Sequence, residues 1–444
     1  MKILLVYTNA FRQIAPAPLG ASLVASRLRR DGHQVRLVDL MFSRSPTEEA
    51  ALAAKELRPD LIGFSLRNVD NQSAASYFNP LPTMRSVVAA AKSAWPAPTL
   101  LGGTAFTTFP AQYLQALGAD YGIAGDDLEP ISGFVSSLGA GRPDLETPGL
   151  VYRENGVHCN PCRIRGYAAT AFDGWDFLDF RPYRKSFDAF WDAGLTVRTG
   201  CPFGCVYCDT YRTFGREWVL RDPRQVAEEL VTLGRRHGVR SVFLADAGFN
   251  RPLHHAKAVL EEIVRARSGV ELNGVFEPGE VDAEFARLFR RAKGSIMMIF
   301  AGSLSDPALE ASHKPFGVSD VLLGARLLGE AGVSYAVSLG LGGPGETRET
   351  VEKSLTRADE LKAVYTWVLH GYRIMPDTPL RDIAVAEGVI APNDDCFQAK
   401  FYYSPATPPE WLDERIKAYA KARQWQQLRG LPWIARVMWN KWRR

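Results

Sequence analysis

Three cysteines lie close together in the middle of the chain, within the segment Thr199–Asp209. Cys201, Cys205 and Cys208 have the spacing C-x3-C-x2-C. Three thiolates on one short loop can hold three irons of a four-iron cluster, and the fourth iron then stays open to a substrate or cosubstrate. A closed structural zinc site requires four ligands, and no second pair of Cys or His follows Cys208 closely. The spacing therefore predicts a [4Fe-4S] cluster with one open iron.

This motif, with the aromatic Tyr207 directly before its last cysteine, resembles the cluster motif of the radical S-adenosylmethionine enzymes. In that family the open iron chelates the amino and carboxylate groups of S-adenosylmethionine. One electron from the reduced cluster then cleaves the sulfonium and yields a 5′-deoxyadenosyl radical. The resemblance implies that Cys201, Cys205 and Cys208 are metal ligands, that Tyr207 lies at the cofactor, and that the enzyme is oxygen-sensitive.

The cluster loop directly follows a predicted strand at residues 195–198, and strand and helix signals alternate from there onward. Loops that carry function at the carboxyl ends of parallel strands are typical of a full or partial (β/α) barrel. We therefore expect a partial (β/α)6 TIM barrel. Its further strands are predicted at 241–244, 272–276, 295–300, 333–339 and 365–372, with helices at 223–237 and 282–292.

Three strand ends of this barrel resemble motifs of the same family. At the second strand the resemblance implies that Asp246 and Asn250 approach the methionine part of the cosubstrate. After the fifth strand, Gly340–Thr347 is similar to a motif whose backbone lies against adenine and ribose, which implies contacts from Gly342, Gly343 and Glu346. A P-loop is excluded there, because no Lys-Ser/Thr pair follows the glycines. Residues 373–380 match the sixth-strand motif and place Met375 at the cofactor.

One departure stands at the fourth strand. Many relatives carry Gly-Val-Glu-Ser after this strand, and here Gly302 takes the place of the glutamate in Ala301-Gly302-Ser303. The departure leaves one ribose or amino contact to the cosubstrate without its expected residue.

The first 140 residues alternate strand and helix signals with buried strands at 2–7, 35–39, 61–66, 99–101 and 121–124. This alternation predicts a doubly wound parallel sheet of the Rossmann-like type, in which ligands lie beyond the carboxyl ends of the strands. The fingerprint G-x-G-x-x-G is absent, which argues against a nicotinamide site.

The segments 18–40, 59–66, 100–110 and 119–131 resemble the cobalamin-binding domain of the cobalamin-dependent radical enzymes. Gly125-Asp-Asp-Leu-Glu129 stands where that family usually has Gly-Glu-Gly-Glu. The motif D-x-H-x-x-G is missing, so we expect cobalamin to bind without its own base and without a protein histidine, with Arg67 or Asn68 below the corrin. The residues that the resemblance places at cobalamin are Ser65, Arg67, Gly102, Gly103, Thr104 and Gly125.

The chain thus divides into a cobalamin-binding-like domain (1–145), an irregular linker (146–190), a radical S-adenosylmethionine core (191–395) and a small helical C-terminal region (396–444). The linker contains His158 and the pair Cys159 and Cys162, which is half a zinc site. Helices are predicted at 410–428 and 433–442. Residues 421–444 hold seven basic residues and no acidic one. These basic residues, interleaved with tryptophans, suit a membrane surface or an anionic partner, and a cap packed on the barrel is the alternative.

With 444 residues, 46% hydrophobic residues and a net charge of +4, the composition is that of an ordinary globular protein without a nucleic-acid footprint. No window approaches 18 uninterrupted apolar residues, and no secretory signal is found, so we expect a cytoplasmic protein in a reducing compartment.

The resemblance implies three cofactors, namely the [4Fe-4S] cluster, S-adenosylmethionine and cobalamin, and an electron donor such as flavodoxin or ferredoxin. It favours a C-methyltransferase that acts on an unactivated carbon of a natural-product or lipid-like precursor. A cyclase or rearrangement enzyme with the same cofactors stays open, as does a non-catalytic corrinoid or iron–sulfur protein. The substrate and the oligomeric state cannot be read from the sequence.

Overall fold

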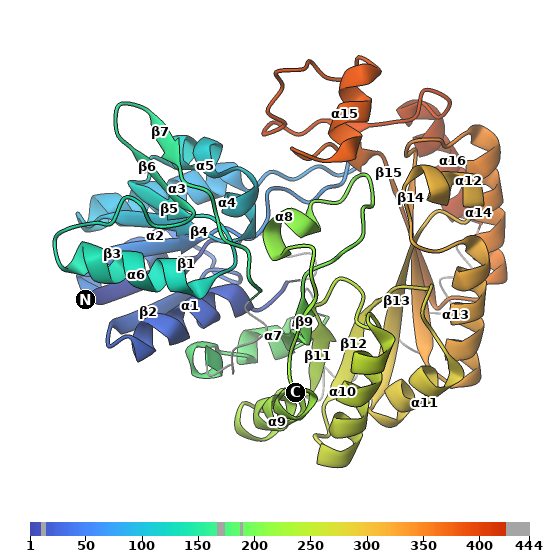
Figure 1. Ribbon diagram of the computed structural model, residues 1–444, viewed down its shortest axis with the longest axis horizontal. Helices are drawn as coiled ribbons and strands as arrows, with labels where there is room; N and C mark the ends of the chain where they lie inside the picture. The colour runs from blue at the N-terminus through green and yellow to red at the C-terminus, as the bar shows by residue number, and fades with distance from the viewer. Residues whose placement is uncertain (10–14, 167–173, 187–189, 423–444) are drawn as a thin grey trace. The chain divides into compact units, whose positions relative to one another are not determined.

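The computed structural model describes residues 1–9, 15–166, 174–186 and 190–422, and the chain forms two compact units, each with its own sheet (Figure 1). Unit 1 comprises residues 1–71, 78–190 and 212–215. Unit 2 comprises residues 72–77, 191–211 and 216–444.

Unit 1 is built on a seven-stranded sheet of order β2-β1-β3-β4-β5-β6-β7. The first five strands are parallel, with pairs such as Ile3↔Val35 and Ile3↔Leu61, and their order is that of a doubly wound sheet with its switch point between β1 and β3. The predicted fold class of this part is confirmed. The strands are β1 (Lys2–Tyr7), β2 (Gln34–Asp39), β3 (Leu61–Ser65), β4 (Thr99–Gly102), β5 (Tyr121–Ile123), β6 (Leu150–Arg153) and β7 (Val157–Cys159).

The prediction that residues 146–190 form an irregular linker is wrong for the segment that contains β6 and β7. β6 pairs antiparallel with β5 through Tyr121↔Tyr152, and β7 folds back on β6. Leu150 is fully buried in the core of unit 1, so burial of its side chain joins this hairpin to the sheet. Each strand has only three or four residues, which is too short for a reliable period-two pattern.

Helices cover the parallel strands of unit 1, and the core lies between them and the sheet. Inward residues of the strands, such as Ile3, Leu61 and Leu100, pack against Leu28 of α1 and Phe134 of α6. The helices are α1 (Leu19–Arg30), α2 (Pro46–Leu57), α3 (Leu81–Ala94), α4 (Thr104–Thr108), α5 (Pro110–Leu117), α6 (Leu128–Gly139) and α7 (Arg181–Lys185), with a short 3-10 turn at η2 (Gly174–Phe177).

Unit 2 is built on six parallel strands of order β15-β14-β13-β12-β11-β8, as expected of a partial (β/α)6 barrel. The first strand lies two residues earlier than predicted, and the last one ends at His370 because Gly371 adopts a positive φ of 73°. The strands are β8 (Ala193–Leu195), β11 (Ser241–Leu244), β12 (Glu271–Phe276), β13 (Gly294–Gly302), β14 (Ser334–Leu341) and β15 (Tyr365–His370).

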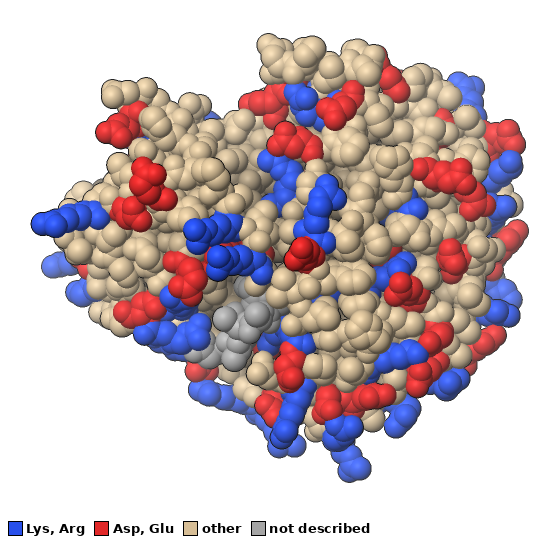
Figure 2. Space-filling model, in the orientation of Figure 1, with Lys and Arg blue, Asp and Glu red and all other residues tan. Residues whose placement is uncertain are grey.

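The two faces of this sheet differ. Residues such as Val242, Leu272, Ile299 and Val337 share one face by register and are almost fully buried. Helices run along the outer side of this sheet (Figure 1). These helices are α9 (Pro223–Arg236), α10 (Leu253–Ala266), α11 (Ala283–Arg291), α12 (Asp306–Ala311), α13 (Val318–Glu330) and α14 (Arg348–Glu360). Acidic and basic side chains are interspersed on their outer surface at the right of Figure 2. Some form exposed pairs one helical turn apart, which contribute little to stability.

Short elements complete the two units. They are α8 (Thr210–Phe214), the antiparallel pairs β9 (Arg198–Thr199) with β10 (Val219–Leu220) and β16 (Tyr372–Arg373) with β17 (Phe401–Tyr402), and the helices α15 (Pro379–Ala386) and α16 (Pro409–Ala422). The predicted basic tail and the helix predicted at 433–442 lie outside the described residues. Within the described ranges, no helix combines the length and the apolar character that a membrane span needs.

Candidate active site

The cluster loop begins directly after β9. Gly200 has a positive φ of 84° and turns the chain into Cys201, and the backbone amide of Cys208 donates to the carbonyl of Cys205 at 3.1 Å. All three cysteines are half-buried and form no disulfide. The thiol of Cys208 lies 3.1 Å from Oγ1 of Thr210.

The electrostatics of this loop suit a metal cluster. Burial and, to a smaller extent, the neighbouring thiolates raise the pKa of the Cys201 and Cys205 thiols, that of Cys205 to about 11. Three deprotonated thiols would therefore be unfavourable here without a bound cation, and iron supplies that charge. No three Cys, His, Asp or Glu side chains in the described residues converge on a single ion. A cluster does not require such convergence, because each thiolate binds a different iron. The residues present thus fit the predicted cluster.

Asp246 and Arg198 hold the start of this loop. Asp246, in the turn after β11, is buried and accepts hydrogen bonds from the amides of Val197 at 3.0 Å and Arg198 at 2.9 Å. The buried guanidinium of Arg198 donates to the carbonyls of Gly200 at 2.6 Å and Gly248 at 2.7 Å. Burial raises the pKa of Asp246 and lowers that of Arg198, and each charge opposes the shift of the other. This pair fixes the first cysteine relative to the second strand.

Asn250 holds the end of the third strand. It is fully buried, its Oδ1 accepts the amide of Glu277 at 2.8 Å, and its Nδ2 donates to the carbonyls of Glu277 at 2.7 Å and Glu280 at 2.8 Å. Its hydrogen-bonding capacity is therefore largely used inside the protein. Contacts of Asp246 and Asn250 with the cosubstrate stay predictions.

Glu346 organises the glycine turn after β14. One carboxylate oxygen accepts the amides of Gly342 and Gly343, the second at 3.3 Å, and the other oxygen accepts the hydroxyl of Ser303 at 3.2 Å. Glu346 is almost fully buried, and burial raises its pKa to about 7. Its carboxylate thus fixes the backbone of two predicted cofactor contacts.

Aromatic side chains bring two more predicted residues into this region. The ring of Tyr207 lies 4.7 Å from that of Tyr372, which donates to the carbonyl of Gly340 at 2.6 Å. Met375 is buried in the loop before α15, where its carbonyl accepts the hydroxyl of Thr378 at 2.8 Å. Unit 2 therefore brings Tyr207 beside the strand end that leads to Gly342.

Two charged residues of this site were missed by the sequence analysis, namely Lys314 and Glu277. Gly302 has a φ of +75°, and a Cβ added there would lie 3.3 Å from Cε of Lys314. The side chain of Lys314 therefore lies next to the space that a larger residue at position 302 would occupy. Burial lowers the pKa of Lys314, but the anionic forms of Tyr207, Cys205 and Glu277 raise it by more, so the net shift is upward. Glu277 follows β12 directly, and its position at a strand end was the signal available in the sequence.

In unit 1 the predicted cobalamin residues gather at the carboxyl ends of the central strands. The carbonyl of Ser65 accepts the amide and hydroxyl of Thr8, and the hydroxyl of Thr104 donates to the carbonyl of Arg67. A Cβ at Gly103 would lie 2.4 Å from the carbonyl oxygen of Leu66, so only glycine fits. The amide of Gly125 donates to the hydroxyl of Thr107 at 3.0 Å, which joins the β5 end to α4. Contacts of these residues, and of Gly102 at the end of β4, with cobalamin stay predictions.

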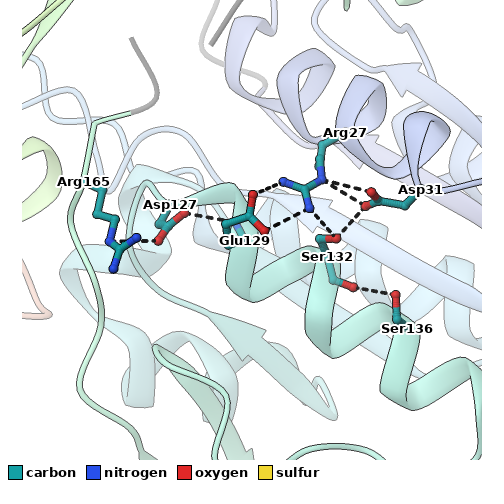
Figure 3. Close-up of polar contacts among 7 residues, drawn as sticks. All are labelled: Arg27, Asp31, Asp127, Glu129, Ser132, Ser136 and Arg165. Atoms are coloured by element: carbon teal, nitrogen blue, oxygen red, sulfur yellow. Dashed lines mark hydrogen bonds and ion pairs between the residues drawn. The ribbon is translucent and has the colours of Figure 1, made fainter. Parts of the chain in front are cut away.

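The acidic residues that replace Gly-Glu-Gly-Glu have structural partners within unit 1 (Figure 3). Asp127 caps α6 by accepting the amide of Glu129 at 3.0 Å, and its carboxylate lies 3.8 Å from Arg165. Glu129 pairs with Arg27 of α1, which also binds Asp31. Asp126 accepts the amides of residues 165 and 166. This loop is therefore tied to two other segments of unit 1 by its own acids.

A second missed group lies at the ends of β1 and β2. The hydroxyl of Tyr183 donates to Asp39 at 2.6 Å, and burial raises the pKa of both groups. The predicted half zinc site gains no support, because Cys159 and Cys162 are exposed and the described residues contain no metal-binding group around them.

Two families match consecutive parts of the chain. The B12 binding domain matches residues 12–135, and the Radical SAM superfamily matches residues 195–358. The chain is similar to a tryptophan 2-C-methyltransferase of Streptomyces laurentii, with 23% identity over 82% of this chain and 72% of that protein. It is also similar to a hopanoid C-3 methylase of Methylococcus capsulatus, with 25% identity over 78% of this chain and 65% of that protein.

Among solved structures, the fold is similar to the radical S-adenosylmethionine methyltransferase TsrM from Kitasatospora setae, determined with cobalamin and a [4Fe-4S] cluster bound. The TM-score is 0.83 at 21% identity, over 96% of this chain and 88% of that chain. These matches confirm the predicted fold class and cofactors, and the coarse prediction of a methyltransferase family.

Proposed function

We propose that this chain, a member of the cobalamin-dependent radical S-adenosylmethionine enzymes, methylates an unactivated carbon of a natural-product or lipid-like small molecule. The observation that carries the proposal is the cluster loop, whose three half-buried cysteines follow a B12 binding domain in one chain. The methylase relatives support methyl transfer, since the tryptophan enzyme and the hopanoid enzyme both have it in their names.

When bound, the cluster with S-adenosylmethionine supplies hydrogen abstraction and cobalamin supplies the methyl group, which together can modify a carbon that has no lone pair. The chain's own residues position these groups. Arg198 and Asp246 fix the cysteine loop, and Glu346 fixes the glycine turn that faces the same end of the barrel. Preorganised positioning of this kind accounts for much of the rate enhancement that a protein can add to a reactive cofactor.

The inner face of the unit 2 sheet supports an apolar substrate. Register places a second set of side chains on the face opposite the outer helices. Four members of this set, namely Asn273, Ile296, Ala336 and Ser338, are buried, whereas most of its apolar members are only partly buried. Phe300 is 41% exposed, Leu369 36% and Tyr365 48%. Apolar side chains that stay open inside a barrel are typical of a pocket for an apolar ligand. The partly buried or exposed apolar members of this face are Phe243, Val275, Met298, Phe300, Tyr365, Trp367 and Leu369.

The proposal includes a one-electron donor such as flavodoxin or ferredoxin, because a resting cluster has to be reduced before it can cleave the sulfonium. It also includes cobalamin without a histidine ligand, with Arg67 facing the corrin. The amide oxygen of Asn68 can orient this guanidinium, since Nη1 of Arg67 donates to Oδ1 of Asn68 at 2.7 Å.

The test uses anaerobically purified and reconstituted protein, whose visible spectrum reports corrin and cluster together. The reduced enzyme is given S-adenosylmethionine with a deuterated methyl group and a panel of aromatic and polycyclic substrates. Methyl transfer predicts S-adenosylhomocysteine, deoxyadenosine and a substrate that gains the labelled methyl. Deoxyadenosine without S-adenosylhomocysteine would indicate a cyclase or rearrangement enzyme. Binding of both cofactors without cleavage would indicate a non-catalytic protein.

A further inference from the structure

Glu277 is a carboxylate that the protein holds firmly at the cluster end of unit 2. Asn250 clamps its backbone on both sides, through the amide at 2.8 Å and the carbonyl at 2.7 Å. A Cβ at Gly248 would lie 2.6 Å from Cγ of Glu277, so the glycine makes room for this side chain. Only 14% of the side chain is exposed. The position of the carboxylate is therefore set by the second and third strand ends together.

One oxygen of this carboxylate lacks a hydrogen-bond donor. Oε2 of Glu277 is buried without a hydrogen-bond partner in the part of the chain that the structure describes, and Nη2 of Arg251 lies 3.9 Å away. Nη1 of Arg251 pairs instead with Oε1 of Glu280, at 2.5 Å. A buried carboxylate oxygen without a donor is costly, which points to a ligand that supplies a positive charge or a donor.

The groups around Glu277 are mainly cationic. Burial raises the pKa of Glu277, and Lys314, Arg251 and Arg198 oppose this rise. Glu280 is the one acid among these groups, and its carboxylate pairs with Arg251. Asp246, the other buried carboxylate nearby, uses its oxygens on backbone amides. At the neighbouring β13 end, Gly302 provides no carboxylate, and the stem of Lys314 borders that position. Glu277 is also close enough to Cys201 and Cys205 to raise the pKa of both thiols.

We propose that Glu277 supplies the negative charge that makes this site bind S-adenosylmethionine in preference to S-adenosylhomocysteine. The two molecules differ by a methyl group and by the positive charge of the sulfonium. Three nearby cations repel a sulfonium, and one buried carboxylate offsets that repulsion. S-adenosylhomocysteine gains nothing from the carboxylate. Glu277 thus favours the replacement of S-adenosylhomocysteine in the site by a new molecule of S-adenosylmethionine. This role rests on the proposed function only because it takes S-adenosylmethionine as the methyl donor.

The experiment measures the dissociation constants of S-adenosylmethionine and S-adenosylhomocysteine by anaerobic calorimetry on the cluster-reconstituted full chain. In Glu277→Gln we expect the preference for S-adenosylmethionine to fall by about tenfold, which corresponds to about 1.4 kcal/mol. Glu277→Asp should restore part of the preference, because it restores the charge. The matched control is Glu280→Gln, which removes a more exposed carboxylate that also pairs with Arg251, and its preference should stay near that of the wild type.

A second variant protects the test against a failure of Glu277→Gln to assemble its cluster. Lys314→Met removes a cation and should change the preference in the opposite direction, toward S-adenosylmethionine. Equal weakening of both ligands in Glu277→Gln, or an unchanged preference in both variants, would overturn the assignment. Methyl transfer to a substrate is not measured, so a wrong proposal about the reaction leaves this result intact.

Discussion

Replacement of Asp246 by asparagine tests whether the buried charges of Asp246 and Arg198 together hold the cluster loop. Asp246 accepts the backbone amides of Val197 and Arg198 through the same oxygen, Oδ1, so an asparagine can keep both hydrogen bonds but loses the negative charge that strengthens them. Hydrogen bonds to a charged group are worth about 1.5–3 kcal/mol each. The charged groups of Asp246 and Arg198 are not in direct contact, but their buried charges stabilise each other. Removal of one member of a directly paired buried ion pair costs about 3–5 kcal/mol, so we place the loss of this longer-range partner at the low end of that range.

The intact pair need not stabilise the fold, since burial raises the pKa of Asp246 and lowers that of Arg198. The cost appears when only one partner is removed. We therefore expect Asp246→Asn to lower the stability of unit 2 by about 3 kcal/mol, which for a domain of this size lowers its Tm by about 6–12 °C. The variant should also retain less iron after reconstitution, because Arg198 holds the carbonyl of Gly200 next to the first cysteine.

The assay is thermal unfolding of the purified chain together with its iron and sulfide content. Asp222→Asn is the matched control, since this exposed residue only caps α9 through the amide of Gln225 at 2.9 Å. Asparagine caps helices about as well as aspartate, so the control should change stability by less than about 0.5 kcal/mol. An unchanged or raised Tm in Asp246→Asn, with full iron content, would refute the reasoning, because it would mean that the carboxylate is only a buried charge without a structural role.

Three further predictions concern residues of unit 2. Cys205→Ala should abolish the visible iron–sulfur absorption and deoxyadenosine formation while corrin binding by unit 1 persists, and retained deoxyadenosine would contradict the cluster assignment. The raised pKa of Glu346 means that the folded state keeps a proton that the unfolded state loses, so its contribution to stability declines as the pH rises from its ordinary 4.5 to about 7. Denaturant titrations across that window should show a shallower decline for Glu346→Gln, and identical slopes would exclude the shift. Gly302→Ala should cost about 1–2 kcal/mol by chemical denaturation, because φ is +75° there and Lys314 lies 3.3 Å from the added Cβ, and a neutral effect would show that the turn relaxes.

Much of the fold followed from patterns that are local in the chain. Long buried strands that alternate with amphipathic helices predicted both parallel sheets, and burial on both faces explains why such strands are easily seen. The hairpin β6–β7 was missed because its strands are short and because its pairing partner, β5, is distant in the sequence, as the pair Tyr121↔Tyr152 shows. The break at Gly371 was missed because strand-forming residues, such as Val368 before it and Tyr372 after it, lie on both sides of the glycine.

The candidate site also has features that could be predicted from the sequence and features that could not. The cysteine spacing was sufficient to predict the cluster, because ligation by three thiolates depends on residues close together in one loop. The glycines and Glu346 of the β14 turn could be identified for the same reason. The roles of Asp246 and Asn250 could not, because their partners, Val197 and Glu277, come from other strand ends.

The sequence by itself thus determined the cofactors and the order in which the two sheets follow one another along the chain. These depend on short motifs and on the periodic burial of side chains. Only the tertiary structure decided which charges meet at the cluster end of the barrel. Lys314 and Glu277 are separated by more than thirty residues, and neither belongs to a motif. Packing of adjacent strand ends brings them together, and a low-dielectric setting makes their charges matter, which no linear pattern encodes.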